Sequence, residues 1–184
     1  EKDLVSITLN GAQTLPASVL SEIKGKDISL NLDMENGFIW KINGTSITAE
    51  TPADTDLSVT NTAEHIPAAL YSLISTNQND FGFHLGRSRA FDFPAVLSVK
   101  ADASCAGLMA NLFWYDVENG VLQCIQTVTV GGAFEDSIPY ADFTLSKGQD
   151  YFIAFGTESL NGRVIHTDGS ITDSDGNYTR PAKA

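Results

Sequence analysis

The side chains best suited to catalysis or metal binding are few and dispersed in this 184-residue sequence. Its three histidines, His65, His84 and His166, fall in separate predicted elements and show no ligand spacing. The sequence has no Gly-x-Ser-x-Gly elbow, phosphate loop, dinucleotide fingerprint or His-Glu-x-x-His motif. Glycoside hydrolysis needs only two carboxylates, but nothing singles out a pair among the 23 acidic residues. We therefore expect a protein that is not an enzyme and has no metal site and no cofactor.

Two short acidic loops were the remaining candidates for metal binding. Asp54 and Asp56 offer paired carboxylates, but Ca²⁺ takes roughly six to eight oxygen ligands. The run from Asp173 to Asn177 resembles the first half of an EF-hand loop. Tyr178 stands where that motif requires glycine, so the run fails the motif. Neither loop is predicted to hold an ion.

Binding is the function best indicated by side-chain chemistry. One face of a predicted hairpin carries Phe113 and Tyr115 interleaved with Asn111 and Gln123. Aromatic rings stack on the apolar faces of sugars, and amide groups pair with sugar hydroxyls. We expect these four residues to bind polysaccharide. The alternative is that a predicted helix covers this face, which would place Phe113 and Tyr115 in the core.

The hairpin that positions these residues spans residues 106–130. Its strands are predicted to meet at a three-residue turn, Glu118-Asn119-Gly120, since glycine readily adopts the left-handed conformation of such a turn. This register places Trp114 opposite Cys124 and Leu112 opposite Gln126, with both strands directing these side chains inward.

An earlier hairpin shows the same pattern. Residues 28–34 and 38–42 flank Glu35-Asn36-Gly37, and a three-residue turn places Leu32 opposite Trp40. One face is then apolar and the other polar, as in a sheet with one solvated face. Trp40 is therefore predicted to lie in the core.

Two helices and further strands complete the predicted fold. Pro16 and Gly25 suit the start and end of one short helix, and apolar spacing indicates another over residues 66–75. Asp168-Gly169 is a favoured hairpin turn. We expect an all-β protein, a mainly antiparallel, immunoglobulin-like β-sandwich with one or two short helices. Residues 1–155 form the predicted module, and residues 156–184 a C-terminal hairpin extension and tail.

Composition excludes several partners. The net charge of −12 opposes binding to nucleic acid, which requires clustered Lys and Arg. No apolar run approaches the ~20 residues that span a bilayer, so no membrane insertion is expected.

A straight strand would hold Cys105 far from Cys124, which predicts two free thiols. The sequence shows no start methionine or signal peptide, which is typical of a trimmed mature region.

Several segments resemble a known group of proteins. They are Ala106 to Tyr115, Gly37 to Gly44, Asp56 to Val59 and Gln149 to Ile153. They are similar to β-sandwich modules of clostridial and ruminococcal surface proteins, over roughly residues 4 to 155. The resemblance implies an extracellular, cell-surface location beside other modules of the same exported protein. The matching motifs are structural, so no functional residue is carried over.

The functional expectation combines this resemblance with the aromatic face. We expect a non-catalytic extracellular accessory module that binds polysaccharide. The alternative is a structural spacer, or a protein-docking or adhesion module, with no small ligand of its own.

Overall fold

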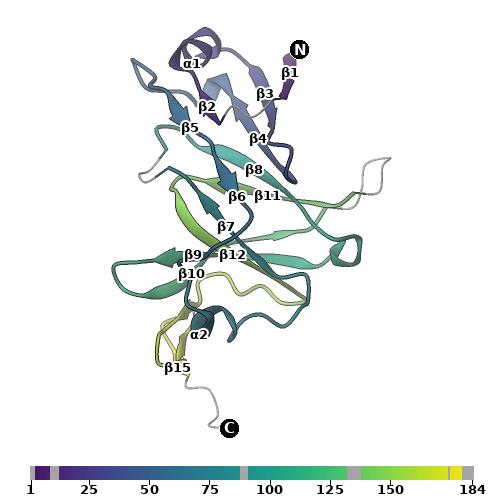
Figure 1. Cartoon of the computed structure of the whole chain (residues 1–184), viewed down its shortest axis with the longest axis vertical. Coiled ribbons are helices and arrows are strands. Elements are labelled where there is room, and N and C mark those ends of the chain that lie inside the picture. Colours follow the sequence, from purple (N-terminus) through teal and green to yellow (C-terminus); the bar gives the residue numbers. More distant parts are fainter. Residues whose placement is uncertain (1–2, 9–12, 88–90, 132–137, 174, 180–184) are drawn as a thin grey trace. The chain divides into compact units, whose positions relative to one another are not determined.

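The computed structural model describes residues 3–8, 13–87, 91–131, 138–173 and 175–179. The fold is all-β, mostly antiparallel and sandwich-like in class, with two short helices (Figure 1). The chain divides into two compact units, each made of three segments. Unit 1 comprises residues 1–60, 85–100 and 142–149, and unit 2 comprises residues 61–84, 101–141 and 150–184.

Unit 1 is built on a sheet with the strand order β1-β3-β4-β8-β11. Its strands are β1 (Asp3–Thr8), β3 (Ile28–Asp33), β4 (Phe38–Asn43), β8 (Ala95–Lys100) and β11 (Tyr140–Leu145), whose first two residues belong to unit 2. The parallel pair β1–β3 is connected through helix α1 (Ala17–Ile23), whereas β3–β4 and β4–β8 are antiparallel. The smaller elements are β2 (Thr14–Leu15), β5 (Thr55–Asp56), β6 (Val59–Thr60) and the 3₁₀ turn η1 (Gly44–Ser46).

The β3–β4 hairpin has the predicted register. Leu32 pairs with Trp40, and the Met34 amide donates to the Phe38 carbonyl, so the turn contains three residues. Gly37 takes a left-handed φ of 89° in this turn. Trp40 is 0 % exposed, and its Nε1 donates to the Leu57 carbonyl at 2.9 Å. The core position predicted for Trp40 is confirmed.

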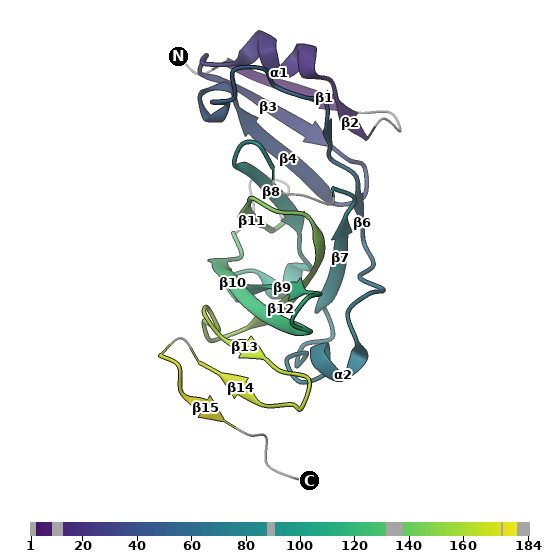
Figure 2. The same cartoon turned by 90° about the vertical axis from the view of Figure 1, so that its left-hand side faces the viewer.

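Unit 2 is built on part of a second sheet, and its own strands run in the order β15-β14-β13-β10-β9-β12-β7 (Figure 2). Its strands are β7 (Phe81–Leu85), β9 (Met109–Asp116), β10 (Val121–Thr129), β12 (Gln149–Gly156), β13 (Val164–Ile165), β14 (Ile171–Thr172) and β15 (Tyr178–Thr179). The last residue of β7 and the first residue of β12 belong to unit 1. The 3₁₀ turn η2 (Ala103–Cys105) and helix α2 (Ala68–Tyr71) complete unit 2. The predicted hairpin at Asp168-Gly169 forms β13 and β14, so residues on both sides of the predicted boundary at 155 belong to this unit.

The central hairpin, β9–β10, differs from its predicted register. Far from the turn, Leu112 pairs with Gln126 as predicted, but Cys124 pairs with Phe113 instead of Trp114. The turn has four residues between Asp116 and Val121, and an irregularity between Cys124 and Gln126 restores the register. Trp114 is only half-buried, so its predicted core position was wrong.

Helix α2 is shorter than the predicted helix over residues 66–75, because regular α-helix covers only Ala68–Tyr71. Helix α1 lies within its predicted range. Cys105 and Cys124 are both free and buried, which confirms the prediction of two free thiols. No helix in the described ranges is long and apolar enough to cross a bilayer.

Candidate functional site

The face of β9 that was predicted to bind polysaccharide is largely covered. Phe113 is 0 % exposed and belongs to an apolar cluster with Ile66, Leu70 and Ile74, which lie in and around α2. The expectation that Phe113 is exposed for ring stacking was therefore wrong. The alternative, in which a helix covers this face, describes the structure. The cause is the apolar spacing of residues 66–74, which buries one side of the α2 segment against β9 and β10.

The other predicted residues divide between this cluster and its surroundings. Tyr115 is half-buried and packs against the cluster. Gln123 is half-buried, and its amide donates to Asp116 at 3.5 Å. Asn111 is buried, with 1 % exposure. A part in ligand binding for Phe113, Tyr115, Asn111 and Gln123 stays a prediction.

Beside the covered face, unit 2 contains a pocket of about 500 Å³, within the range of small-ligand sites. Asn111 and Phe113 both line it. The remaining apolar part of the lining includes Leu73, Ile74, Leu108, Phe155, Leu160 and Ile165. The polar part includes Thr76, Asn77, Thr157, Glu158 and Arg163. The lining thus combines apolar side chains with neutral, negatively charged and positively charged hydrogen-bonding groups.

Asn111 holds one wall of the pocket. Its amide nitrogen donates to the carbonyls of Ala154 and Glu158, at 3.3 and 3.1 Å. Its amide oxygen accepts from the Leu160 amide at 2.8 Å and from the Thr127 hydroxyl at 2.7 Å. The bonds with Glu158 and Leu160 attach the segment 158–160 to the sheet, and the other two lie within the sheet. The chemical role of Asn111 in the structure is to position this wall, since its amide is engaged within the protein.

Asp80 holds a second wall of the pocket in a similar way. One carboxylate oxygen accepts from the backbone amides of Thr76 and Asn77, and the other accepts from the Phe155 amide at 2.8 Å. A single side chain thereby joins the turn after α2 to β12. Both walls of the pocket are fixed by side chains that bind backbone groups, which favours a preformed site.

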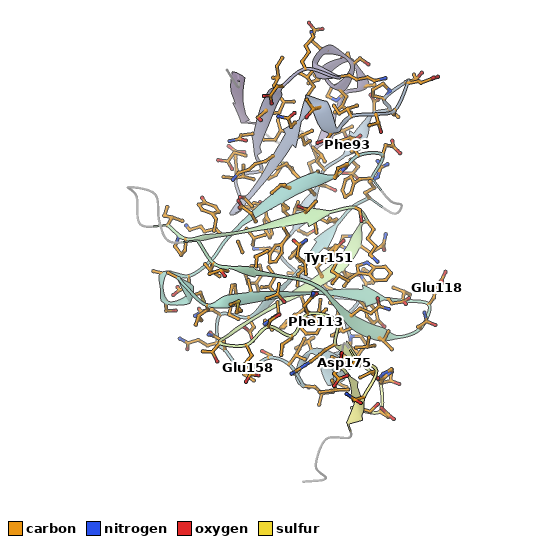
Figure 3. The ribbon with its side chains drawn as sticks, turned by 180° about the vertical axis from the view of Figure 1, so that it is seen from behind. Phe93, Phe113, Glu118, Tyr151, Glu158 and Asp175 are labelled. Carbon is orange, nitrogen blue, oxygen red and sulfur yellow. The ribbon has the colours of Figure 1, made fainter. Side chains whose placement is uncertain are left out.

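Charged groups lie at the outer part of the pocket. Glu158 is exposed and lies at the surface, whereas Phe113 lies among the strands of unit 2 (Figure 3). Arg163 is half-buried. Nearby, burial raises the pKa of the Cys124 thiol to about 11, while Thr127 and Arg163 act in the opposite direction. The Cys124 thiol is therefore uncharged at neutral pH and lies in the core.

A second group of reactive side chains lies elsewhere in unit 2. His65, His84 and Asp150 each offer a ligand atom, and these atoms lie within 4.8 Å of one another. The three histidines show no ligand spacing in the sequence, and His84 and Asp150 are 66 positions apart. His84 lies in a predicted strand, but the sequence contains no signal that it meets Asp150; the two residues come together because β7 and β12 are neighbours in one sheet.

The acidic loops considered for Ca²⁺ use their carboxylates locally. Asp54 accepts from the Ala17 amide at the start of α1, and Asp56 accepts from the Ser58 amide. Asp173 accepts from the backbone and side chain of Asn177, and these bonds lower its pKa. Each carboxylate therefore has a structural explanation.

Comparison with known proteins adds no further identification. No family model, no curated protein and no solved structure matches this chain. The geometry of the pocket and of the histidine–aspartate cluster therefore carries the functional interpretation.

Proposed function

We propose that the chain is a non-catalytic binding module and that the pocket of unit 2 binds a short segment of a saccharide. The observation that carries the proposal is the composition of the pocket, where apolar side chains occur together with amide, hydroxyl and charged groups. Sugars present apolar ring faces and hydroxyls together, so they match a lining of this kind. The volume of about 500 Å³ lies within the range of small-ligand sites.

The proposal differs in detail from the sequence-based expectation. Phe113 contributes to the floor as a buried side chain, and Asn111 positions a wall. The groups available to a saccharide include Glu158 and Arg163 among the polar lining residues and Leu73 among the apolar ones. Leu73 is one of the large hydrophobic side chains that is exposed, at 38 %.

An extracellular, cell-surface location is part of the proposal. It is supported by the resemblance to surface modules and by the negative net charge of −12, which suits a solvated module better than a partner of anionic polymers. Other modules of the same exported protein would then be its covalent neighbours.

Affinity electrophoresis in gels that contain starch, xylan or β-glucan tests the proposal. We expect retarded migration on at least one of these, followed by measurable binding of its oligosaccharides in calorimetry. Glu158→Gln is expected to weaken binding by about tenfold, because it removes a charged hydrogen-bond acceptor from the pocket.

Glu118→Gln is the matched control, since Glu118 is an exposed glutamate at the tip of the β9–β10 hairpin, remote from the pocket lining (Figure 3). It should leave binding unchanged. If no glycan retards the protein, the saccharide proposal fails and the spacer or docking module becomes the better interpretation. Equal effects of the two substitutions would show that the pocket is not the binding site.

A further inference from the structure

The histidine–aspartate cluster of unit 2 has the composition of a metal site. His65 lies in the segment before α2, His84 on β7 and Asp150 on β12. His84 Nδ1 lies 2.9 Å from Asp150 Oδ1, and His65 Nδ1 lies 3.3 Å from Asp150 Oδ2. Two imidazoles therefore direct a ring nitrogen at the two oxygens of one carboxylate.

The spacing of these atoms fits a small dication. A tetrahedral zinc ion with bonds of about 2.0–2.1 Å separates its ligand atoms by about 3.3–3.4 Å. The His65–Asp150 separation of 3.3 Å matches that value, the His84–Asp150 separation of 2.9 Å is a hydrogen-bond length, and the three ligand atoms lie within 4.8 Å of one another. Only small movements would bring all three into contact with one ion.

Burial and charge favour a cation at the same place. The Asp150 side chain is 2 % exposed, so its carboxylate is removed from bulk water. With neutral imidazoles the cluster carries one negative charge, which a divalent ion would more than balance. The two imidazole rings are 5.6 Å apart, centroid to centroid. A metal ion at this place would take both ring nitrogens and the carboxylate as ligands.

The cluster is also accessible from solvent. The His65 side chain is 69 % exposed and that of His84 is 27 % exposed, which provides an entry path. Two histidines and one carboxylate supply three ligands, and a water molecule can complete a tetrahedral shell. Nitrogen ligands favour zinc and related transition metals over Ca²⁺ and Mg²⁺, which prefer oxygen.

We propose that His65, His84 and Asp150 form a binding site for a divalent transition-metal ion, with zinc as the preferred occupant. The ion would tie the segment before α2 to β7 and β12. Since Ile66, the residue after His65, lies in the apolar cluster beneath α2, the ion would stabilise the attachment of this segment to the sheet. An ion that binds the folded chain preferentially raises its thermal stability.

The test uses the full chain after treatment with a chelator, with zinc chloride as the probe in calorimetry at neutral pH. We expect saturable binding of one zinc ion per chain and a zinc-dependent rise in melting temperature. His65→Ala and His84→Ala should each weaken binding by more than about tenfold, because each removes one of three protein ligands. Calcium and magnesium chloride should bind far more weakly than zinc.

His166→Ala is the matched control. His166 bonds to the Thr172 hydroxyl at 2.8 Å and lies outside the cluster, so its removal should leave zinc affinity unchanged. His65 is exposed, so its substitution tests the site without disturbing the core. Absence of saturable zinc binding, or binding that survives both His65→Ala and His84→Ala, would overturn the proposal.

Discussion

Asn111 was predicted to bind a ligand, and in the structure its side chain stabilises the fold. The sequence places it on a face with two aromatic residues, a combination typical of sugar sites. In the structure it is buried, and its amide makes four hydrogen bonds to strand β12, to segment 158–160 and to Thr127. A buried amide whose bonding groups are all engaged is a structural anchor.

Replacing this anchor should be costly. Asn111→Ala leaves the groups that bond to the Asn111 amide without a hydrogen-bond partner at a buried site. We therefore expect the free energy of unfolding to fall by about 2–3 kcal/mol. Chemical denaturation monitored by tryptophan fluorescence measures this change. Thr127→Val removes only one of the four bonds and should cost about 1 kcal/mol. Equal costs for the two substitutions would contradict the anchoring role.

Single residues were predictable where one local pattern decided their environment. Trp40 sits in a hairpin whose alternating apolar and polar positions allow one register, and it is buried as predicted. Phe113 depends on what covers the sheet, which is decided by the distant residues 66–74. His84 and Asp150 meet only because β7 and β12 share a sheet. Such long-range pairings leave no spacing signal in the sequence.

At the scale of elements, the two glycine-containing hairpins behave differently. The turn of β3–β4 has three residues, as the sequence predicts. The turn of β9–β10 has four, because Asp116 accepts hydrogen bonds from the backbone and side-chain amides of Asn119 and closes the turn one residue earlier. A bulge then restores the register farther along. The sequence pattern alone does not distinguish a three-residue turn from a four-residue turn.

The longer turn still requires glycine at its end. Gly120 has a φ of 63°, a conformation that costs a residue with a Cβ atom roughly 1–2 kcal/mol. We expect Gly120→Ala to lower the free energy of unfolding by about that amount, measured by urea denaturation. Gly131→Ala is the control, because Gly131 is exposed and an added Cβ there would meet the Tyr140 carbonyl at an ordinary 3.5 Å. A Gly131→Ala cost as large as that of Gly120→Ala would contradict the conformational argument.

For the molecule as a whole, stability should decline in alkaline solution. Burial raises the pKa of Cys124 to about 11, and burial also raises the pKa of Tyr151 well above its ordinary value. The unfolded chain loses these protons at lower pH than the folded chain. The associated stability is therefore fully present at neutral pH and is lost as the pH rises from about 9 to 11.

We expect the thiol alone to account for a fall of about 2 kcal/mol over this range. Denaturation at a series of pH values measures it. Cys124→Ala should flatten the profile over the same interval, since it removes the ionising group. A variant with the same alkaline slope as the original protein would show that the thiol is not responsible.

The all-β class was predictable from alternation and turn residues, because those signals are local. The partition into two units was not. Unit 1 and unit 2 each collect three separate segments, so no shift in composition marks a boundary between them. The parallel pairing of β1 with β3 was also absent from the prediction, since period-two patterns do not reveal strand direction.

This interleaving of segments has a consequence for biosynthesis. Unit 1 takes its last segment, residues 142–149, from late in the chain, and unit 2 needs residues up to the C-terminal strands. A nascent polypeptide emerging from a ribosome would therefore hold unfinished sheets until most of it had been translated. Translational pausing before residue 142 would prolong that interval. Binding to chaperones during it would be more important for this chain than for one whose units are contiguous.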